Sequence, residues 1–543
     1  MKNLSATDST WPARAALCLA VLLAYTSVWP NAFVFDDTFL IVRNVFLRHW
    51  SSIPALLTSQ NFAGGGQAGL FYRPVPMLLH FFVYQAFGPS TVAFHALNII
   101  LQALNACLLH HFGLRAGFRK GAAFAAALLW AVHPLHIEAI AYMSSTPELL
   151  WGAFCLLGLI TLLPDFAPQK ICLALVYFTL GLGSKETAVV FPALAVITLF
   201  FVSKDRAQIS TYLRTWPLWL LAAGYAAIWA LFIHKTGYTM EHVGGMTAST
   251  DYYNNIITRA LTFLATLPFY ARLVVWPAGL HMDWNFPVYS TLLAWQPAVG
   301  GLMALLACTQ LLLWKRRLAL CFGLLWFAIV MFPASGIAFP VDAFISEHWL
   351  YMPLMGLFLG AAQTADVLFK KKPDTARLFV LALALSLGIT TFFQNEIWRN
   401  PETLYLNALR NGGEPSRLED YMGMYYMEQQ EFDKAAGQFQ MEVNNPKRGP
   451  NQSLPHLQLA MALLQLHMVD GDSFSPESIC DSVRSSPHVT EAIGELGKAL
   501  QSDPGFSPAH KALTFIYLCQ GNKTMADFHE KQAAGILQEQ GGQ

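Results

Sequence analysis

TVAFHALNIILQALNACLLHHFGLRAGFRKGAAFAAALLWAVHPLHIEA, residues 91–139, contains two apolar runs separated by a short basic turn. The runs, at 91–114 and 121–142, have the ~17–25 residues that a helix needs to cross the hydrocarbon core of a bilayer. Basic residues between two such runs are typical of a cytoplasmic loop. The stretch therefore predicts two membrane-spanning helices joined on the cytoplasmic side.

Apolar runs of this kind continue over the first 395 residues of the chain. The chain has 543 residues, of which 55% are hydrophobic and 13% are charged, whereas soluble domains carry about 25% charged residues. We predict an all-α polytopic membrane domain at 1–395, followed by a soluble helical domain at 396–543. Eleven spans are expected, at 14–30, 91–114, 121–142, 147–163, 170–183, 187–202, 216–233, 296–314, 318–335, 349–367 and 377–394.

The basic residues between the spans predict the topology. They lie at 115–120, 170, 204–214, 315–317 and 370–377. The positive-inside rule places all these clusters in the cytoplasm if the apolar segments 74–88 and 255–278 do not cross. The N-terminus is then inside and the tail outside, in the periplasm if the chain is bacterial or in the ER lumen if it is eukaryotic. The alternative is that one weak span is miscounted. The first run resembles a signal peptide, but no small-residue cleavage site follows it, so we expect an anchor.

Charge and cysteine content exclude some functions and leave others open. The formal net charge is zero, so no nucleic-acid partner is expected. The eight cysteines show no zinc-type spacing. Cys480 and Cys519 lie in the soluble tail and would form a disulfide if that side of the membrane is oxidising. The sequence does not decide this bond, metal dependence or oligomeric state.

The tail contains helix pairs that resemble tetratricopeptide repeats. One pair covers YMGMYYMEQQEFDKAAGQFQMEVNNP (421–446), a second surrounds VTEAIGELGKALQSDPG (489–505), and a third follows Pro508. Small residues at regular positions and terminal prolines are typical of such repeats. About three repeats are expected, the middle one interrupted by a loop near 469–487. Such arrays present a concave surface for peptides, and the alternative is an unrelated helical bundle.

Ionisable and other polar residues concentrate in the five loops that this topology places outside. Charged groups near a bilayer are costly and usually face a cavity or each other, so we expect one polar cleft. Each set alone has a plainer explanation, such as a solvated helix end or a hairpin turn. The sets are Asp36 and Asp37; Tyr72, Arg73 and His80; His133, His136 and Glu138; Lys185 and Glu186; His281 and Asp283; and Asp342, Glu347 and His348.

This mixture of residues fits group transfer from a lipid phosphate. A carboxylate can accept the proton of an attacking hydroxyl or bind a divalent metal. Arg holds phosphate in a bidentate fork and Lys holds it as a point charge. No Walker loop occurs, so the energy must reside in the donor bond. The alternatives are a transporter, which would have charges at mid-membrane, and a membrane scaffold that presents the repeats.

Six short motifs together carry a family resemblance. FVFDD (33–37), YRPV (72–75), HPLHIEA (133–139), SKE (184–186), LHMDW (280–284) and SEHWLYMPLMG (346–356) occur in that order. With the repeat tail, the chain resembles the transmembrane-and-tetratricopeptide-repeat O-mannosyltransferases and their bacterial relatives, in the GT-C class of glycosyltransferases. The resemblance covers nearly the whole chain. The family's last motif often reads Glu-Arg-Tyr-Leu-Tyr, and His348 stands here in place of the Arg.

The resemblance implies a GT-C-like fold, a polyprenyl-phosphate-linked sugar donor and an acidic base in the first outer loop. The base would be Asp36 or Asp37. The acceptors would be Ser or Thr hydroxyls of proteins that the tail recruits. The sugar would be transferred to them by a single inverting displacement. The alternative acceptor is a lipid or polysaccharide, and the sugar is not named. Arg73, Lys185, His348 and His136 would hold the donor phosphate, and Tyr72, His133, Glu138, Glu186, Asp283 and Glu347 would support the site.

Overall fold

The computed structural model describes residues 10–66, 69, 71–163, 166–203, 212–236, 250–315, 317–341, 343–445, 452–466 and 476–541. The chain forms two compact units, Met1–Leu404 and Tyr405–Gln543. Within the described residues all regular elements are helices and no strand occurs. The predicted all-α fold class is therefore confirmed.

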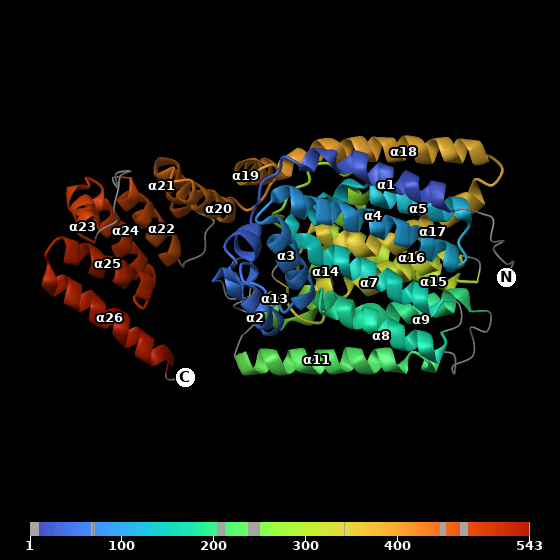
Figure 1. The fold of residues 1–543 in the computed structure, drawn as a ribbon, viewed down its shortest axis with the longest axis horizontal. Coiled ribbons are helices and arrows are strands. Elements are labelled where there is room, and N and C mark those ends of the chain that lie inside the picture. The colour runs from blue at the N-terminus through green and yellow to red at the C-terminus, as the bar shows by residue number, and fades with distance from the viewer. Residues whose placement is uncertain are drawn as a thin grey trace. The chain divides into compact units, whose positions relative to one another are not determined.

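Each of the eleven apolar runs forms a helix in the first unit. These helices run side by side in Figure 1. Apolar residues occupy all sides of these helices, and polar and apolar faces are hardly separated. This pattern is typical of helices surrounded by lipid and by other helices. They are α1 (Trp11–Tyr25), α4 (Thr91–Arg115), α5 (Lys120–Ala131), α7 (Thr146–Leu162), α8 (Pro168–Leu182), α9 (Phe191–Val202), α11 (Trp216–Thr236), α15 (Trp295–Leu312), α16 (Leu318–Met331), α17 (Tyr351–Leu368) and α18 (Pro373–Gln394).

Length and hydropathy support membrane insertion of this unit. Among the described residues, 5 helical stretches are long and apolar enough to cross a membrane, or up to 6 when the bent pair at 120–141 is taken as one span. That pair bends by 57° at Val132–His133, where Pro134 follows and disfavours helical backbone at His133. Several helices of 10–17 residues are also apolar. The chain is thus an integral membrane protein, and the number of eleven spans stays a prediction.

The two ambiguous segments form helices that contact loops predicted to lie outside. In α14 (Ile256–Val275), the Arg259 guanidinium donates to the Ile337 carbonyl, and the Tyr270 hydroxyl accepts from the Ser346 amide at 3.4 Å. Both partners lie between α16 and α17. In α3 (Pro74–Phe87), the Val75 amide in the first turn donates to the Gly183 carbonyl. The Gln85 side chain near the other end donates to the Leu47 carbonyl at 2.7 Å. These contacts agree with the expectation that neither segment crosses the membrane, and that expectation stays a prediction.

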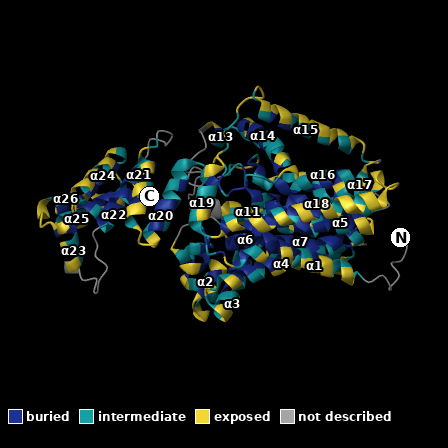
Figure 2. Ribbon diagram, turned by 90° about the horizontal axis from the view of Figure 1, so that it is seen from above, coloured by how far each residue is buried: buried dark blue, intermediate teal, exposed yellow. Residues whose placement is uncertain are grey.

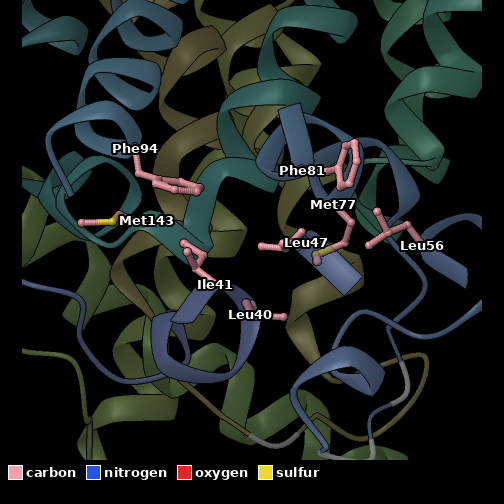
Figure 3. Packing of buried hydrophobic residues seen from close by; sticks show 8 residues of the cluster. All are labelled: Leu40, Ile41, Leu47, Leu56, Met77, Phe81, Phe94 and Met143. Atoms are coloured by element: carbon pink, nitrogen blue, oxygen red, sulfur yellow. The ribbon is translucent and has the colours of Figure 1, made fainter. Parts of the chain in front are cut away.

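A hydrophobic cluster fixes the first loop to the bundle. Short helices at Thr38–Val42, Val45–Leu47 and Ile53–Thr58 (α2) bring their apolar side chains onto α3 and α4. Figure 3 shows how these side chains converge from separate elements. Burial of such side chains stabilises the loop by roughly 1.5–3 kcal/mol each. The cluster consists of Leu40, Ile41, Leu47, Leu56, Met77, Phe81, Phe94 and Met143.

Close packing of α16 on α17 positions the last outer loop. A side chain at Gly356 would overlap Trp326, and the Cα of Gly323 faces Gly360. Small residues allow helix backbones to approach in this way in membranes. The Trp326 indole donates to the Met352 carbonyl at 2.8 Å. The short helix Glu347–Leu350, which leads into α17, is thereby held in a defined place.

The second unit consists of amphipathic helices packed in pairs. Contacts join α20 (Pro415–Glu428) with α21 (Phe432–Val443), α22 (Ser453–Gln465) with α24 (Val489–Ser502), and α25 (Ser507–Cys519) with α26 (Lys523–Gly541). Their small residues Ala435, Ala492 and Ala499 are fully buried. The pairs are those expected from the repeat-like pattern. The family assignment of the repeats stays a prediction.

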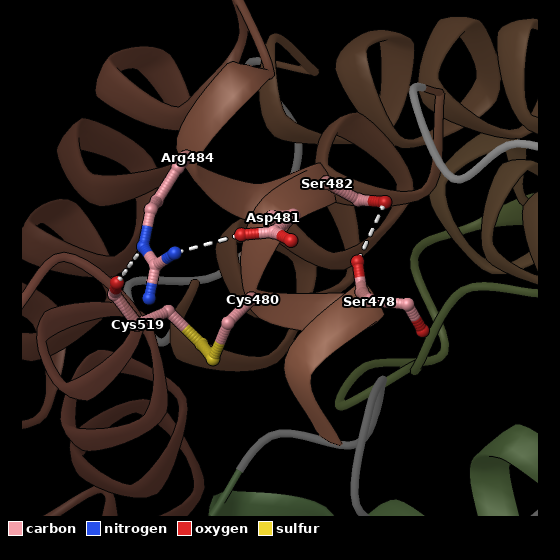
Figure 4. The surroundings of a disulfide bond; sticks show 6 residues. All are labelled: Ser478, Cys480, Asp481, Ser482, Arg484 and Cys519. Atoms are coloured by element: carbon pink, nitrogen blue, oxygen red, sulfur yellow. Dashed lines mark hydrogen bonds and ion pairs between the residues drawn. A yellow bond between two sulfur atoms is a disulfide. The ribbon is translucent and has the colours of Figure 1, made fainter. Parts of the chain in front are cut away.

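The predicted loop inside the middle repeat contains a helix, α23 (Pro476–Ser485). Cys480 of this helix forms a disulfide with Cys519 at the end of α25 (Figure 4). The Arg484 guanidinium also donates to the Cys519 carbonyl, at 2.5 Å. The sequence pattern missed the helix because its charged and polar residues resemble those of a loop. The Cys480–Cys519 disulfide, which the sequence did not decide, is therefore formed.

Candidate active site

The start of α7 brings together side chains from four distant segments. Residues Met143–Ser145 form a short helix that leads directly into α7, whose first turn contains Thr146, Pro147 and Glu148. Ser144 contacts the first loop, the Thr146 hydroxyl lies 3.1 Å from the His80 ring of α3, and Glu148 pairs with Lys185. Pro favours a helix start at this point because its missing N–H needs no partner there.

Asp37 is held on both carboxylate oxygens. Its Oδ1 accepts from the Ser144 amide at 2.8 Å and from the Ser144 hydroxyl at 2.5 Å, and its Oδ2 accepts from the Val34 amide at 3.1 Å. The residue has no exposed surface. Burial raises the pKa of Asp37 to about 7, although these three hydrogen bonds oppose the rise. Asp37 therefore shapes the loop rather than facing solvent.

Asp36 lies in a different environment although it adjoins Asp37. It is partly exposed and follows Phe35, which has a positive φ of 51°. A bulky residue in this left-handed region is strained and is often found at functional sites. Tyr142 lies beside both carboxylates. The two neighbouring acids thus differ in burial, with Asp37 fully buried and Asp36 partly exposed.

Arg73 forms a bidentate ion pair with Glu186. Its Nε donates to Oε2 at 3.0 Å and its Nη2 donates to Oε1 at 2.7 Å. The guanidinium carbon also lies 4.3 Å from the centre of the Phe71 ring. The two charged side chains are 16% and 31% exposed, respectively. Glu186 takes the Nε hydrogen and one Nη2 hydrogen, so the other N–H groups of Nη1 and Nη2 are those through which Arg73 can meet a ligand.

Lys185 and His348 are linked through Glu148. The Lys185 ammonium pairs with Glu148 Oε1, and the His348 Nε2 lies 3.9 Å from the same oxygen. On its other side, His348 Nδ1 lies 2.8 Å from Glu138 Oε1, and its amide donates to Glu138 Oε2 at 2.9 Å. His348 therefore has a carboxylate beside each of its ring nitrogens.

Glu347 points away from this chain of charges. Its Oε1 accepts from the His281 amide at 2.8 Å. Burial and the charge of Glu138 raise the pKa of Glu347 well above its usual range. The His281 ring lies on Trp284, with centroids 3.8 Å apart. Glu347 therefore fixes the fourth outer loop.

The other predicted residues are dispersed around the site. His136 is fully buried among the rings of Trp130 and Tyr351. The His133 Nε2 faces the Val274 carbonyl at 3.0 Å. The Tyr72 hydroxyl donates to the Leu57 carbonyl at 2.6 Å, and Asp283 is buried. Asp342 lies outside the described residues.

Sequence reasoning missed the residues that join the site, above all Glu148, Ser144 and Ser346. The Ser346 hydroxyl lies 2.7 Å from His348 Nδ1. Glu148 follows a Pro in a first helical turn, where an acid usually serves only the helix dipole, so its partner was not foreseen. Asp37, Glu148 and Lys185 are brought together by folding and are far apart in the sequence. Among the described residues, no group of three or more His, Cys, Asp or Glu is arranged to hold a metal ion.

The site combines a partly exposed carboxylate with an alternating row of charges. The row runs Arg73, Glu186, then Lys185, Glu148, His348 and Glu138. Opposite charges at these distances lower the cost of burying each one. Arg73 and His348, which is 24% exposed, are the basic side chains of this row that a ligand could reach. The fold and the site define a polytopic membrane protein with buried acid and base groups at one end of its bundle.

Comparisons with known proteins identify its relatives, although no family model matches the chain. It is similar to the protein O-mannosyl-transferase TMTC1 of Homo sapiens, with 28% identity over 459 residues, 74% of this chain and 51% of the relative. The protein O-mannosyl-transferase F38B6.6 of Caenorhabditis elegans is 26% identical, over 72% of this chain and 56% of the relative. For Tmtc3 of Drosophila melanogaster the identity is 23%, over 79% and 54%. The resemblance predicted from the motifs is thereby confirmed.

The chain spans about half the length of these curated relatives. Among solved structures, it matches the oligosaccharyltransferase of Archaeoglobus fulgidus, which was crystallised with a tethered acceptor peptide. The sequence identity is 14% and the TM-score 0.36, over 79% of this chain and 59% of the other. A score of this size leaves the GT-C-like arrangement a prediction.

Proposed function

We propose that this protein is a membrane glycosyltransferase that moves a sugar from a polyprenyl phosphate to Ser or Thr hydroxyls of protein acceptors outside the cytoplasm. The observation that carries the proposal is that Asp37, next to the partly exposed Asp36, accepts from Ser144 directly before α7, whose first turn carries Glu148 of the charged row. The names of the relatives, all protein O-mannosyl-transferases, support the same reaction class.

In this proposal Asp36 is the general base. Asp37 has both oxygens occupied by three donors, which leaves its neighbour to meet the acceptor hydroxyl. The acceptor O–H bond breaks and its proton passes to Asp36. The acceptor oxygen bonds to the anomeric carbon as the bond from that carbon to the phosphate oxygen breaks. The electron pair leaves with the lipid phosphate, and a single displacement of this kind inverts the anomeric centre.

Arg73 is the proposed principal ligand of the phosphate, with His348 in a supporting role. Both are cations with exposed surface, and an Arg can form charge-assisted hydrogen bonds with phosphate through its remaining N–H groups. Lys185 is 7% exposed and paired with Glu148, so its charge would act through the row. Such cationic groups contribute most when they stabilise the negative charge that develops on the leaving phosphate.

The tail is the proposed acceptor-recruiting domain. It contains an apolar cavity of about 390 Å³ between α22, α23 and α25, lined by residues including Met461, Val483 and Phe515. The Cys480–Cys519 disulfide fits an oxidising compartment, as expected for a periplasmic or lumenal tail. This agrees with a topology in which the basic clusters are cytoplasmic.

The test is transfer of a radiolabelled sugar from a polyprenyl phosphate to a Ser/Thr peptide by the purified protein in lipid vesicles. Asp36→Asn should lower turnover by about 10²–10⁴-fold, the range for a lost general base, with little change in donor affinity. Asp374→Asn, an exposed acid at the start of α18, is the matched control and should transfer normally. Normal turnover of folded Asp36→Asn would refute this mechanism. Transfer only to lipid or polysaccharide acceptors would refute the protein acceptor.

A further inference from the structure

An apolar cavity lies at the opposite end of the bundle from the candidate active site. It measures about 190 Å³ and is formed where α9 and α15 end and α16 begins. Its walls carry almost no polar surface. The residues that line it are Ile197, Phe200, Phe201, Leu311, Trp314, Leu318, Cys321, Phe322 and Leu325.

The helix α15 beside this cavity is long and apolar enough to cross a membrane, so lipid is the expected surrounding. Helix α15 is among the least covered spans, with 11% of its apolar window buried inside the protein, and Figure 2 shows it largely exposed at the edge of the unit. An empty apolar cavity loses dispersion contacts on its walls. Within a bilayer, the molecules that can supply those contacts are lipid chains.

Two basic side chains stand at the rim of the cavity. Lys315 is exposed and its ammonium lies 5.8 Å from the centre of the Trp314 ring, which is itself part of the wall. Arg317 is exposed and its guanidinium donates to the Gln310 side chain. No carboxylate of the described residues is within ion-pair distance of either cation. An anionic group here would therefore gain two cationic partners without displacing an acid.

We propose that this cavity is a binding site for an anionic phospholipid. One acyl chain would fill the space between α9, α15 and α16, and the head group would lie against Lys315 and Arg317. Basic pockets between membrane helices on the cytoplasmic side recognise anionic head groups in this way. Trp314 serves both parts of the lipid, since its ring lines the cavity and also faces the Lys315 ammonium. The site is independent of the proposed transfer reaction.

Native mass spectrometry of the purified chain, with phosphatidylglycerol and phosphatidylcholine as probes, tests the site. The wild-type protein should bind phosphatidylglycerol more tightly than phosphatidylcholine. A Lys315→Gln/Arg317→Gln variant should bind it about 25-fold more weakly, because each cation near an anionic surface contributes about a factor of five. The matched control is Lys371→Gln/Lys372→Gln, which removes two exposed cations from the turn before α18 and should bind normally.

A second variant tests the cavity itself. Leu318→Trp adds a large ring to the wall and should lower phosphatidylglycerol binding without changing the rim. If that variant does not fold, Leu311→Phe fills the same space with a smaller ring. Equal binding of the two phospholipids, equal weakening by the control variant, or full binding by a folded cavity-filled variant would each overturn the proposal. Preference for polyprenyl phosphate over phosphatidylglycerol would overturn it in favour of the donor lipid.

Discussion

Ion pairs in the membrane unit and in the tail differ in both range and burial. In the tail, Lys434 pairs with Glu431 and Arg484 pairs with Asp481, each one helical turn apart, and all four side chains are exposed. At the candidate site, Arg73 pairs with Glu186 across 113 residues. A buried exception in the tail is His456 with Glu495, at 2.6 Å.

The difference shows what each kind of pair does. An exposed pair within one helix contributes about 0–1 kcal/mol and follows from local spacing. A buried pair between distant segments carries a large desolvation cost and is often no more stabilising than apolar residues would be. The buried row at the start of α7 is therefore better explained by a function than by stability.

The largest stability effect is expected for Lys185→Ala. This change leaves Glu148 buried without its cation, and breaking a buried pair in this way costs about 3–5 kcal/mol. Chemical unfolding in detergent measures the loss. A Lys185→Met/Glu148→Leu double variant should recover most of the stability while losing transfer activity. Poor stability of the double variant would show that the pair itself stabilises the fold, and would remove the contrast with the tail.

Loss of the disulfide should have the next largest effect. Cys480→Ser opens a covalent link across a separation of 39 residues, and removal of a native disulfide typically costs about 2–4 kcal/mol. Hydrogen exchange should increase in α23 and α25 and stay unchanged in the membrane helices. Reducing agent should have the same effect on wild type, with Cys172→Ser, at an exposed free cysteine, as the control. Unchanged exchange in α23 would show that its other contacts suffice.

Ser144→Ala should cost about 1.5–3 kcal/mol at pH 8, the range for a hydrogen bond to a charged group. The pKa of Asp37 is about 7, so its carboxylate is mostly ionised at pH 8 and mostly protonated at pH 5. The hydroxyl of Ser144 stabilises the ionised form, so the stability difference from wild type should grow as the pH rises through 7. Unfolding at both pH values measures it. Ser145→Ala, in the same short helix, should lack this pH dependence. A difference that is constant with pH would mean that Asp37 does not titrate in this range.

The smallest effect is expected in the tail. Lys434→Ala removes an exposed partner of Glu431 and should change the free energy of unfolding by at most about 1 kcal/mol. The change should shrink in high salt, because exposed charges are screened. Thermal unfolding at two salt concentrations measures both. A loss above 2 kcal/mol would mean that exposed pairs in the tail matter as much as the buried row.

Apolar runs of sufficient length predicted the helices of the membrane unit, and the 3.6-residue pattern predicted the tail pairs. These are local properties, since a helix satisfies its backbone hydrogen bonds within its own segment. The six motifs pointed to Asp36, Asp37, Arg73 and Lys185 as chemistry-bearing residues. Helix α23 was missed because its ten residues are mostly polar and charged and resemble those of a loop.

The sequence by itself determined the fold class, the membrane insertion and the family resemblance of this protein, because each depends on patterns along the chain. Tertiary structure alone gave Asp37 its distant donor, Ser144, 107 residues away. It also paired Glu148 with Lys185 and placed His348 between two carboxylates. Such partners are chosen when helices pack in three dimensions, and no spacing within one segment encodes a contact between segments that are far apart in the chain.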